Sequence, residues 1–195
     1  MPNNDAIDWE IYDETMKQLI KQAVETFVQT ESDLVSQISI YTDIRQGCSG
    51  VDFETKLHAL RHNSWRANET ERQGISEIAT LYRQRELNLD SGDFKYTEFA
   101  TVSHPELGGL EQLNEELKLF YAEHDDNGLA TTFQKLAQIE EVQSKRLQSV
   151  INQSLTTGAF DALPTESPYF IGSNSPTDWY DHILKVEEGK VTLQN

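Results

Sequence analysis

The stretch from Asn127 to Leu155, NGLATTFQKLAQIEEVQSKRLQSVINQSL, carries the strongest helix signal in this chain. It contains no proline, and its single glycine, Gly128, lies at its start. One set of its residues recurs in alternating steps of four and three, the spacing of a helix that packs against other helices. This set is mostly apolar and consists of Leu129, Phe133, Leu136, Glu140, Gln143, Leu147, Val150 and Ser154. We therefore expect one long, partly buried helix here.

The same spacing appears twice further upstream. A first helix is expected over residues 8–44, with Ile20, Val24, Phe27, Glu31, Leu34, Ile38 and Tyr41 along one face. The glycines of residues 47–50, GCSG, would end it, because glycine readily adopts the left-handed conformation that follows a helix. A second helix is expected over residues 52–87. Its middle is very polar, and Gly74 weakens it by about 1 kcal/mol relative to alanine, so it is either interrupted or has a wet centre.

A third helix is expected from Ser103 to His124. Its start matches a capping box, in which a serine is followed three residues later by a glutamate, here Glu106. The short turn DDNG, residues 125–128, would make this helix an antiparallel neighbour of the helix from Asn127. Residues 88–102 alternate only weakly and have no evident strand partner, so we expect a loop packed on the helices.

These elements predict an all-α fold, an antiparallel four-helix bundle formed by residues 1–157. Residues 158–195 form a C-terminal extension rich in proline and aromatic residues. Pro164, Pro168 and Pro176 exclude a long helix there. The apolar residues between them predict that the extension packs on the bundle, with a short helix over residues 176–186.

Composition narrows the classes of function. The formal charge is −17, from 33 acidic and 16 basic residues, which disfavours nonspecific binding to nucleic acid or anionic lipid. The single cysteine, Cys48, excludes an intrachain disulfide and is typical of a reducing compartment. The chain contains no apolar run of the roughly 18 residues that span a bilayer, and its first residues do not resemble a secretory signal. We therefore expect a cytoplasmic protein.

An acidic surface serves solubility, binding of a basic protein, or imitation of nucleic acid. Our first hypothesis is a non-enzymatic protein that acts through protein–protein interaction, as an adaptor, inhibitor or regulator that binds a basic partner surface. Long helices with projecting ends often pair, so a homodimer is also expected. The expected contact residues are acidic and lie at several points of the chain: Asp13, Glu14, Glu69, Glu86, Asp125 and Asp126.

Three glutamates, Glu31, Glu71 and Glu140, lie on stripes predicted to be buried, where a carboxylate needs a partner or a metal. Residues 121–147, YAEHDDNGLATTFQKLAQIEEVQSKRL, resemble the turn into the last metal-binding helix of the ferritin-like and rubrerythrin-like family. The resemblance implies a helical bundle with an iron or manganese site at these glutamates. Gln143 and Gly74 stand where the family has histidine ligands, so the implied site is altered. The alternative is that the three glutamates form structural ion pairs.

Residues 57–64, LHALRHNS, resemble the phosphoacceptor helix of histidine phosphotransfer domains, which are also four-helix bundles. The resemblance implies that His58 is the phosphoacceptor and that Arg61 is its basic neighbour. His62 replaces the small residue of that pattern. His58 and His62 also share one helix face, a spacing that can bind zinc. No nucleophile elbow, phosphate-binding glycine loop or dinucleotide fingerprint is present.

Overall fold

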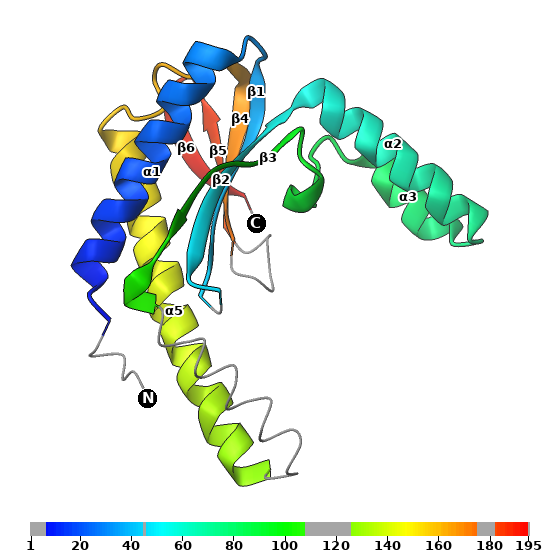
Figure 1. Cartoon of the computed structure of the whole chain (residues 1–195). Coiled ribbons are helices and arrows are strands. Elements are labelled where there is room, and N and C mark those ends of the chain that lie inside the picture. Colours follow the sequence, from blue (N-terminus) through cyan, green and yellow to red (C-terminus); the bar gives the residue numbers. More distant parts are fainter. Residues whose placement is uncertain (1–6, 45, 108–125, 175–181, 195) are drawn as a thin grey trace.

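A six-stranded mixed sheet, in the order β3-β2-β1-β4-β5-β6, forms the centre of the molecule (Figure 1). The computed structural model describes residues 7–44, 46–107, 126–174 and 182–194. All neighbouring strands are antiparallel except β1 and β4, which are parallel. The strands are β1 (Val35–Asp43), β2 (Cys48–Thr55), β3 (Tyr96–Ser103), β4 (Thr165–Asn174), β5 (Ile183–Glu187) and β6 (Lys190–Gln194).

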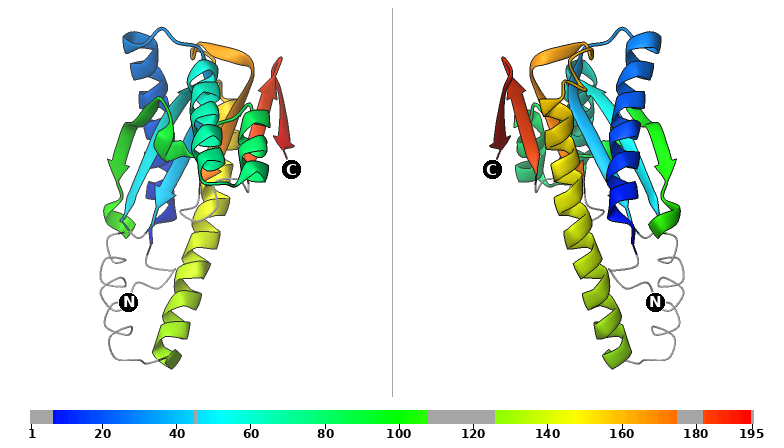
Figure 2. Two further views of the ribbon diagram at one scale, coloured as in Figure 1. Left: turned by 90° about the vertical axis from the view of Figure 1, so that its right-hand side faces the viewer. Right: turned by 90° about the vertical axis from the view of Figure 1, so that its left-hand side faces the viewer.

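Helices α1 (Trp9–Thr30) and α5 (Asp126–Thr156) lie side by side on one face of the sheet (Figures 1 and 2). Helices α2 (Lys56–Arg72) and α3 (Ser76–Gln84) form a hairpin that projects from the other side. Short 3-10 turns, η2 (Ser91–Asp93) and η3 (Pro105–Leu107), flank β3. We call the face under α1 and α5 the helix face, and the opposite one the open face.

The prediction of an all-α four-helix bundle is wrong, because six strands form the centre of the fold. The expected helix over residues 8–44 ends at Thr30, and β1 begins at Val35. Leu34, Ile38 and Tyr41 fit helical spacing, but residues 37–42 also alternate, with Ile38 and Ile40 in the core. Isoleucine, valine and threonine prefer strands, and the pairing of β1 with β2 and β4 decides between the two periodicities.

The expected helix over residues 52–87 is replaced by the end of β2 and two shorter helices. Thr55 caps α2, accepting a hydrogen bond from the N–H of His58 at 3.3 Å. Of the two alternatives for this segment, a wet centre or an interruption, the structure shows an interruption, because Gly74 has a φ of +80° between α2 and α3. Only glycine adopts this conformation without strain.

The loop expected over residues 88–102 is also wrong, because Tyr96–Ser103 form β3. Its pairing partner is β2, whose residues are expected from the sequence partly in the turn over residues 47–50 and partly in the second helix. The C-terminal extension contributes β4, β5 and β6 to the same sheet rather than a short helix over residues 182–186. Most of the expected third helix, and the start of the short one, lie outside the described residues.

The long helix predicted over residues 127–155 is confirmed as α5. Its described stripe residues Leu136, Gln143, Leu147, Val150 and Ser154 are buried, whereas Glu140 is half-buried. The apolar side of α1 is buried in the same layer, and each large side chain contributes about 1.5–3 kcal/mol. Phe27 packs against Phe53, Tyr96 and Phe99, with ring centroids 4.7–5.5 Å apart.

Candidate functional site: the acidic part of the open face

The three glutamates of the expected metal site lie on separate parts of the fold. Glu31 follows α1 and accepts a hydrogen bond from the Tyr96 hydroxyl at 3.1 Å. Glu71 pairs with Arg83 near the tip of the α2–α3 hairpin, and Glu140 lies on α5. Among the described residues, no group of three or more histidines, cysteines or carboxylates is placed to hold a metal ion. The ferritin-like interpretation is therefore wrong in its fold, and its ligand set does not assemble.

The acidic residues expected to contact a partner also do not form one surface. Asp13 and Glu14 lie on α1, and Asp13 pairs with Arg146 at 2.7 Å. Glu69 and Glu86 belong to the α2–α3 hairpin and its exit, on the other side of the sheet (Figure 1). Asp125 lies outside the described residues, and Asp126 is the first residue of α5.

His58 lies in the first turn of α2 and is held by a buried carboxylate. Its Nδ1 lies 2.9 Å from Oε2 of Glu54, which is 0% exposed. The amide of Asn88 donates to the same oxygen at 3.0 Å. The contact orients the imidazole and satisfies Glu54, which would otherwise be costly to bury. The resemblance to phosphotransfer domains implied a four-helix bundle, which the six-stranded sheet excludes. The role of His58 as a phosphoacceptor stays a prediction.

A chain of buried polar side chains crosses the helix face. The amide of Gln143 donates to the Tyr12 hydroxyl at 2.9 Å, and Tyr12 and Thr42 share a hydrogen bond of 2.8 Å. Thr42 continues to Ser49 at 2.7 Å, and Ser49 to His104 Nε2 at 2.7 Å. Ser49 and His104 have nucleophile–base spacing, but they are 0% and 1% exposed, so a substrate cannot reach them. Gln143, which stands at the expected histidine position, is thus part of the core.

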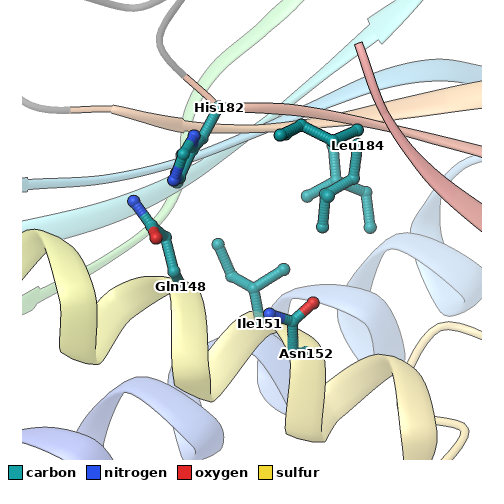
Figure 3. A pocket seen from close by; sticks show the side chains of 8 residues that line it. Gln148, Ile151, Asn152, His182 and Leu184 are labelled. Carbon is teal, nitrogen blue, oxygen red and sulfur yellow. The ribbon is translucent and has the colours of Figure 1, made fainter.

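A cavity of about 210 Å³ lies between α5 and strands β4, β5 and β6 (Figure 3). Its lining is mainly apolar, with Ile151 and Leu184 labelled in Figure 3, while Gln148, Asn152 and His182 supply polar groups. Typical ligand pockets measure roughly 300–1,000 Å³. This cavity is smaller and its lining is mainly apolar, so we interpret it as a gap in the packing of the core beside β6 rather than as a ligand site.

The open face carries a different group of residues, which we call the acidic face: Tyr41, Asp43, Asp52 and Glu98. Tyr41 and Gly50 are cross-strand partners, and a Cβ at Gly50 would overlap the tyrosine ring. The outer end of the ring therefore lies directly over residue 50, which has no side chain. Glu98 has a φ of +48°, and its backbone N–H donates to Asp52 Oδ1 at 2.7 Å.

The electrostatics of the acidic face are strongly negative. Burial, followed by the charges of Asp52 and Glu98, raises the pKa of Tyr41 to about 12. Burial also raises the pKa of Asp52 to about 7, with Glu98 adding to the shift and its N–H opposing it. Burial, Asp43 and Glu98 raise the pKa of the Cys48 thiol, which keeps the thiol protonated and unreactive. An aromatic ring surrounded by carboxylates is a suitable contact for a lysine or arginine.

Sequence analysis missed Tyr41, Asp43, Asp52 and Glu98 as a group. Residues 37–43 are predicted to belong to a helix, residues 47–50 to the turn that ends it, and residues from 52 onward to the next helix. Their side chains are therefore not expected on a common face. Alternation of Gln37, Ser39 and Tyr41 with isoleucines was the signal that a strand interpretation would have used.

Comparison with protein-family models, with curated proteins and with solved structures finds no match for this chain. No helix in the described parts of the chain combines the length and apolarity that crossing a membrane requires.

Proposed function

We propose that this protein acts without catalysis, by binding a basic surface of another protein at its acidic face. The observation that carries the proposal is the placement of three carboxylates, Asp43, Asp52 and Glu98, around the Tyr41 ring on the open face, close enough for their charges to act on its hydroxyl. The formal charge of −17 supports it, since long-range attraction accelerates encounter with a basic protein. The single cysteine agrees with the cytoplasm as the place of action.

The test is binding of a basic protein probe, cytochrome c, measured by titration calorimetry. Glu98→Lys reverses a charge on the acidic face at an exposed side chain, and we expect at least about tenfold weaker binding, or roughly 1.4 kcal/mol. Raising the salt from about 0.1 M to 1 M shortens the screening length from roughly 10 Å to 3 Å and should weaken binding further.

The chain offers a matched control in Glu188→Lys. Glu188 is also an exposed glutamate, and its φ of +50° is close to the +48° of Glu98. It lies in the β5–β6 turn, beyond the Val186–Tyr169 pair, whereas Tyr41 pairs with Asn174 at the other end of β4. If both variants lose binding equally, the loss comes from the change in net charge alone, and this outcome would contradict binding at a defined acidic face.

An inhibitor that imitates nucleic acid is one form of this proposal. In that form the basic partner is itself a nucleic-acid-binding protein. Added DNA would then compete for the partner through its specific, tight binding and lower the apparent affinity, whereas another kind of basic partner binds DNA only nonspecifically, and that competition fades as the salt rises.

A further inference from the structure

The α2–α3 hairpin, residues 56–85, which we call the arm, exposes an unusual amount of apolar surface. Six large apolar side chains of the arm are 43–59% exposed: Leu57, Leu60, Trp65, Ile75, Ile78 and Leu81. Tyr82 follows Ile78 by one helical turn. Its side chain lines a small cavity at the base of the arm together with Arg66 and Arg85. Trp65 stacks with Arg66, whose guanidinium carbon is 5.3 Å from the ring centre. Exposed apolar patches of this kind mark interaction sites.

The arm leaves these side chains uncovered because its two helices meet through small residues. The buried residues of α2 are Ala59, Asn63 and Ala67, and Ala79 is the one buried in α3. Two helices packed through alanines form a single thin layer, whereas a stable helical unit needs a second layer against its apolar stripe. The arm projects from the sheet, so nothing in the described parts of the chain provides that layer (Figure 1).

The arm also differs from the rest of the chain in charge. It holds six basic and three acidic residues, a net charge of +3. The other residues hold 10 basic and 30 acidic residues, a net charge of −20. Lys56 and Arg61 are exposed beside Leu57 and Leu60. The arm is therefore a basic, apolar surface on an acidic protein.

The arm and the acidic face lie on the same side of the sheet. The segment leaving the arm packs on the open face, where Gln37 donates to the carbonyl of Asn88 at 2.8 Å. In the left view of Figure 2, α2 and α3 stand in front of the strands. With 17 residues, α2 is about 25 Å long. When two copies face each other about a two-fold axis, each arm can extend over the other's open face.

We propose that a second copy of this chain docks here, with the arm of each copy on the acidic face of the other. The inference rests on the proposed function, since the arm is then one basic surface that the acidic face binds. Charge complementarity argues for this occupant, because the arm has a net charge of +3 and the acidic face presents the carboxyl groups of Asp43, Asp52 and Glu98. The six exposed apolar side chains of the arm would become buried on docking. The two contacts are equivalent, so the assembly closes as a dimer.

The first experiment is sedimentation equilibrium of the full chain over a range of concentrations. We expect a mass of twice 22.3 kDa that falls toward 22.3 kDa as the salt rises from about 0.1 M to 1 M. A mass of 22.3 kDa at every concentration and salt would overturn the inference.

The second experiment compares Ile78→Glu on the arm with Val28→Glu on α1. Both side chains are exposed, 44% and 43%, so neither substitution disturbs the core. Ile78→Glu is expected to raise the dissociation constant at least about tenfold, whereas Val28→Glu leaves it within about twofold. Equal effects of the two variants would contradict docking through the arm.

The third experiment mixes Ile78→Glu with Glu98→Lys. Each variant alone has a defect in both contacts of its dimer. The mixture places the intact arm of one on the intact acidic face of the other, so one contact is complete. Recovery of dimer on mixing supports docking of arm on face. Two variants that stay monomeric when mixed would overturn the inference. A Glu98→Lys variant that dimerises as well as the wild type would show that arms pair with arms, and would overturn it too.

Failure of the dimer and failure of the proposed function are distinguished with the Ile78→Glu variant and cytochrome c. This variant keeps its acidic face. If the wild type is monomeric but Ile78→Glu still binds cytochrome c in a manner sensitive to Glu98→Lys, the inference falls and the proposed function stands. If cytochrome c does not bind either, both fall.

Discussion

Single residues in this protein take their properties from the strand on which they lie. Asp52 is 3% exposed because β2 places it on the open face between β1 and β3. Its carboxyl accepts the N–H of Glu98, and burial still raises its pKa to about 7. Tyr41 lies over Gly50 for a related reason, since the two are cross-strand partners. A sequence shows the residue types, but only pairing of the strands makes them neighbours.

The first prediction concerns Asp52 and pH. Its pKa rises from 3.8 unfolded to about 7 folded, so the folded state binds more protons between these values. Stability therefore falls as the pH increases from about 4 to 7. Asp52→Asn removes this loss while keeping an acceptor for Glu98. We expect the variant to be more stable than wild type above pH 7, by up to about 4 kcal/mol for three pKa units. The difference should disappear near pH 4.

Urea unfolding at several pH values measures this difference in the free energy of unfolding. Asp33→Asn is the control, because it is expected to change that free energy in the opposite direction. Hydrogen bonds from Lys95 and Tyr96 lower the pKa of Asp33, so its charged form stabilises the fold at neutral pH and the benefit fades on acidification. Asp33→Asn should therefore lose stability at neutral pH. An Asp52→Asn variant that loses stability at pH 8 would contradict the raised pKa of the buried Asp52 carboxyl.

At the scale of elements, the arm and the sheet differ in how much they bury. The strand β1 is covered by neighbours on both edges, and Ile38 and Ile40 are 0% exposed. The arm buries only small residues, and α3 is nine residues long. Helices of this length are marginal without tertiary packing. The polar middle of the expected second helix, for which an interruption or a wet centre is predicted, lies mostly within α2, and the chain turns only at its end, at Gly74.

The second prediction follows from this difference. Amide hydrogen exchange should be faster in α2 and α3 than in β1 and β2, because local opening of the arm costs less than opening of the sheet. The measurement is exchange mass spectrometry in about 1 M salt, where arm docking is weakened. Exchange in α5, whose Leu147, Val150 and Ile151 are buried, serves as the helical reference. Equal protection of the arm and α5 under these conditions would contradict a thin, uncovered layer.

At the scale of the whole molecule, residues far apart in sequence complete one sheet. β4 lies beside β1 in the middle of the sheet although about 120 residues separate them along the chain. The parallel pairing requires a long crossover, which α5 helps to provide. The third prediction is therefore that a chain ending at Thr157 does not fold, because β1 would lose its neighbour and Ile171 would leave the core.

Circular dichroism and thermal unfolding measure this outcome. The control is removal of residues 190–195, which takes away β6 alone, an edge strand whose residues are all exposed. We expect that variant to keep a cooperative transition. A cooperative transition in the chain ending at Thr157 would show that residues 1–157 form an independent unit.

The sequence by itself determined what depends on local spacing and composition. The helix at residues 127–155 and the buried face of α1 follow from neighbours three or four residues apart. The tertiary structure decided whether residues 35–43, 48–55, 96–103 and 165–174 are strands, because a strand is stabilised by partners that spacing does not reveal. It also decided the acidic face, since Tyr41, Asp52 and Glu98 meet only through the pairing of three strands.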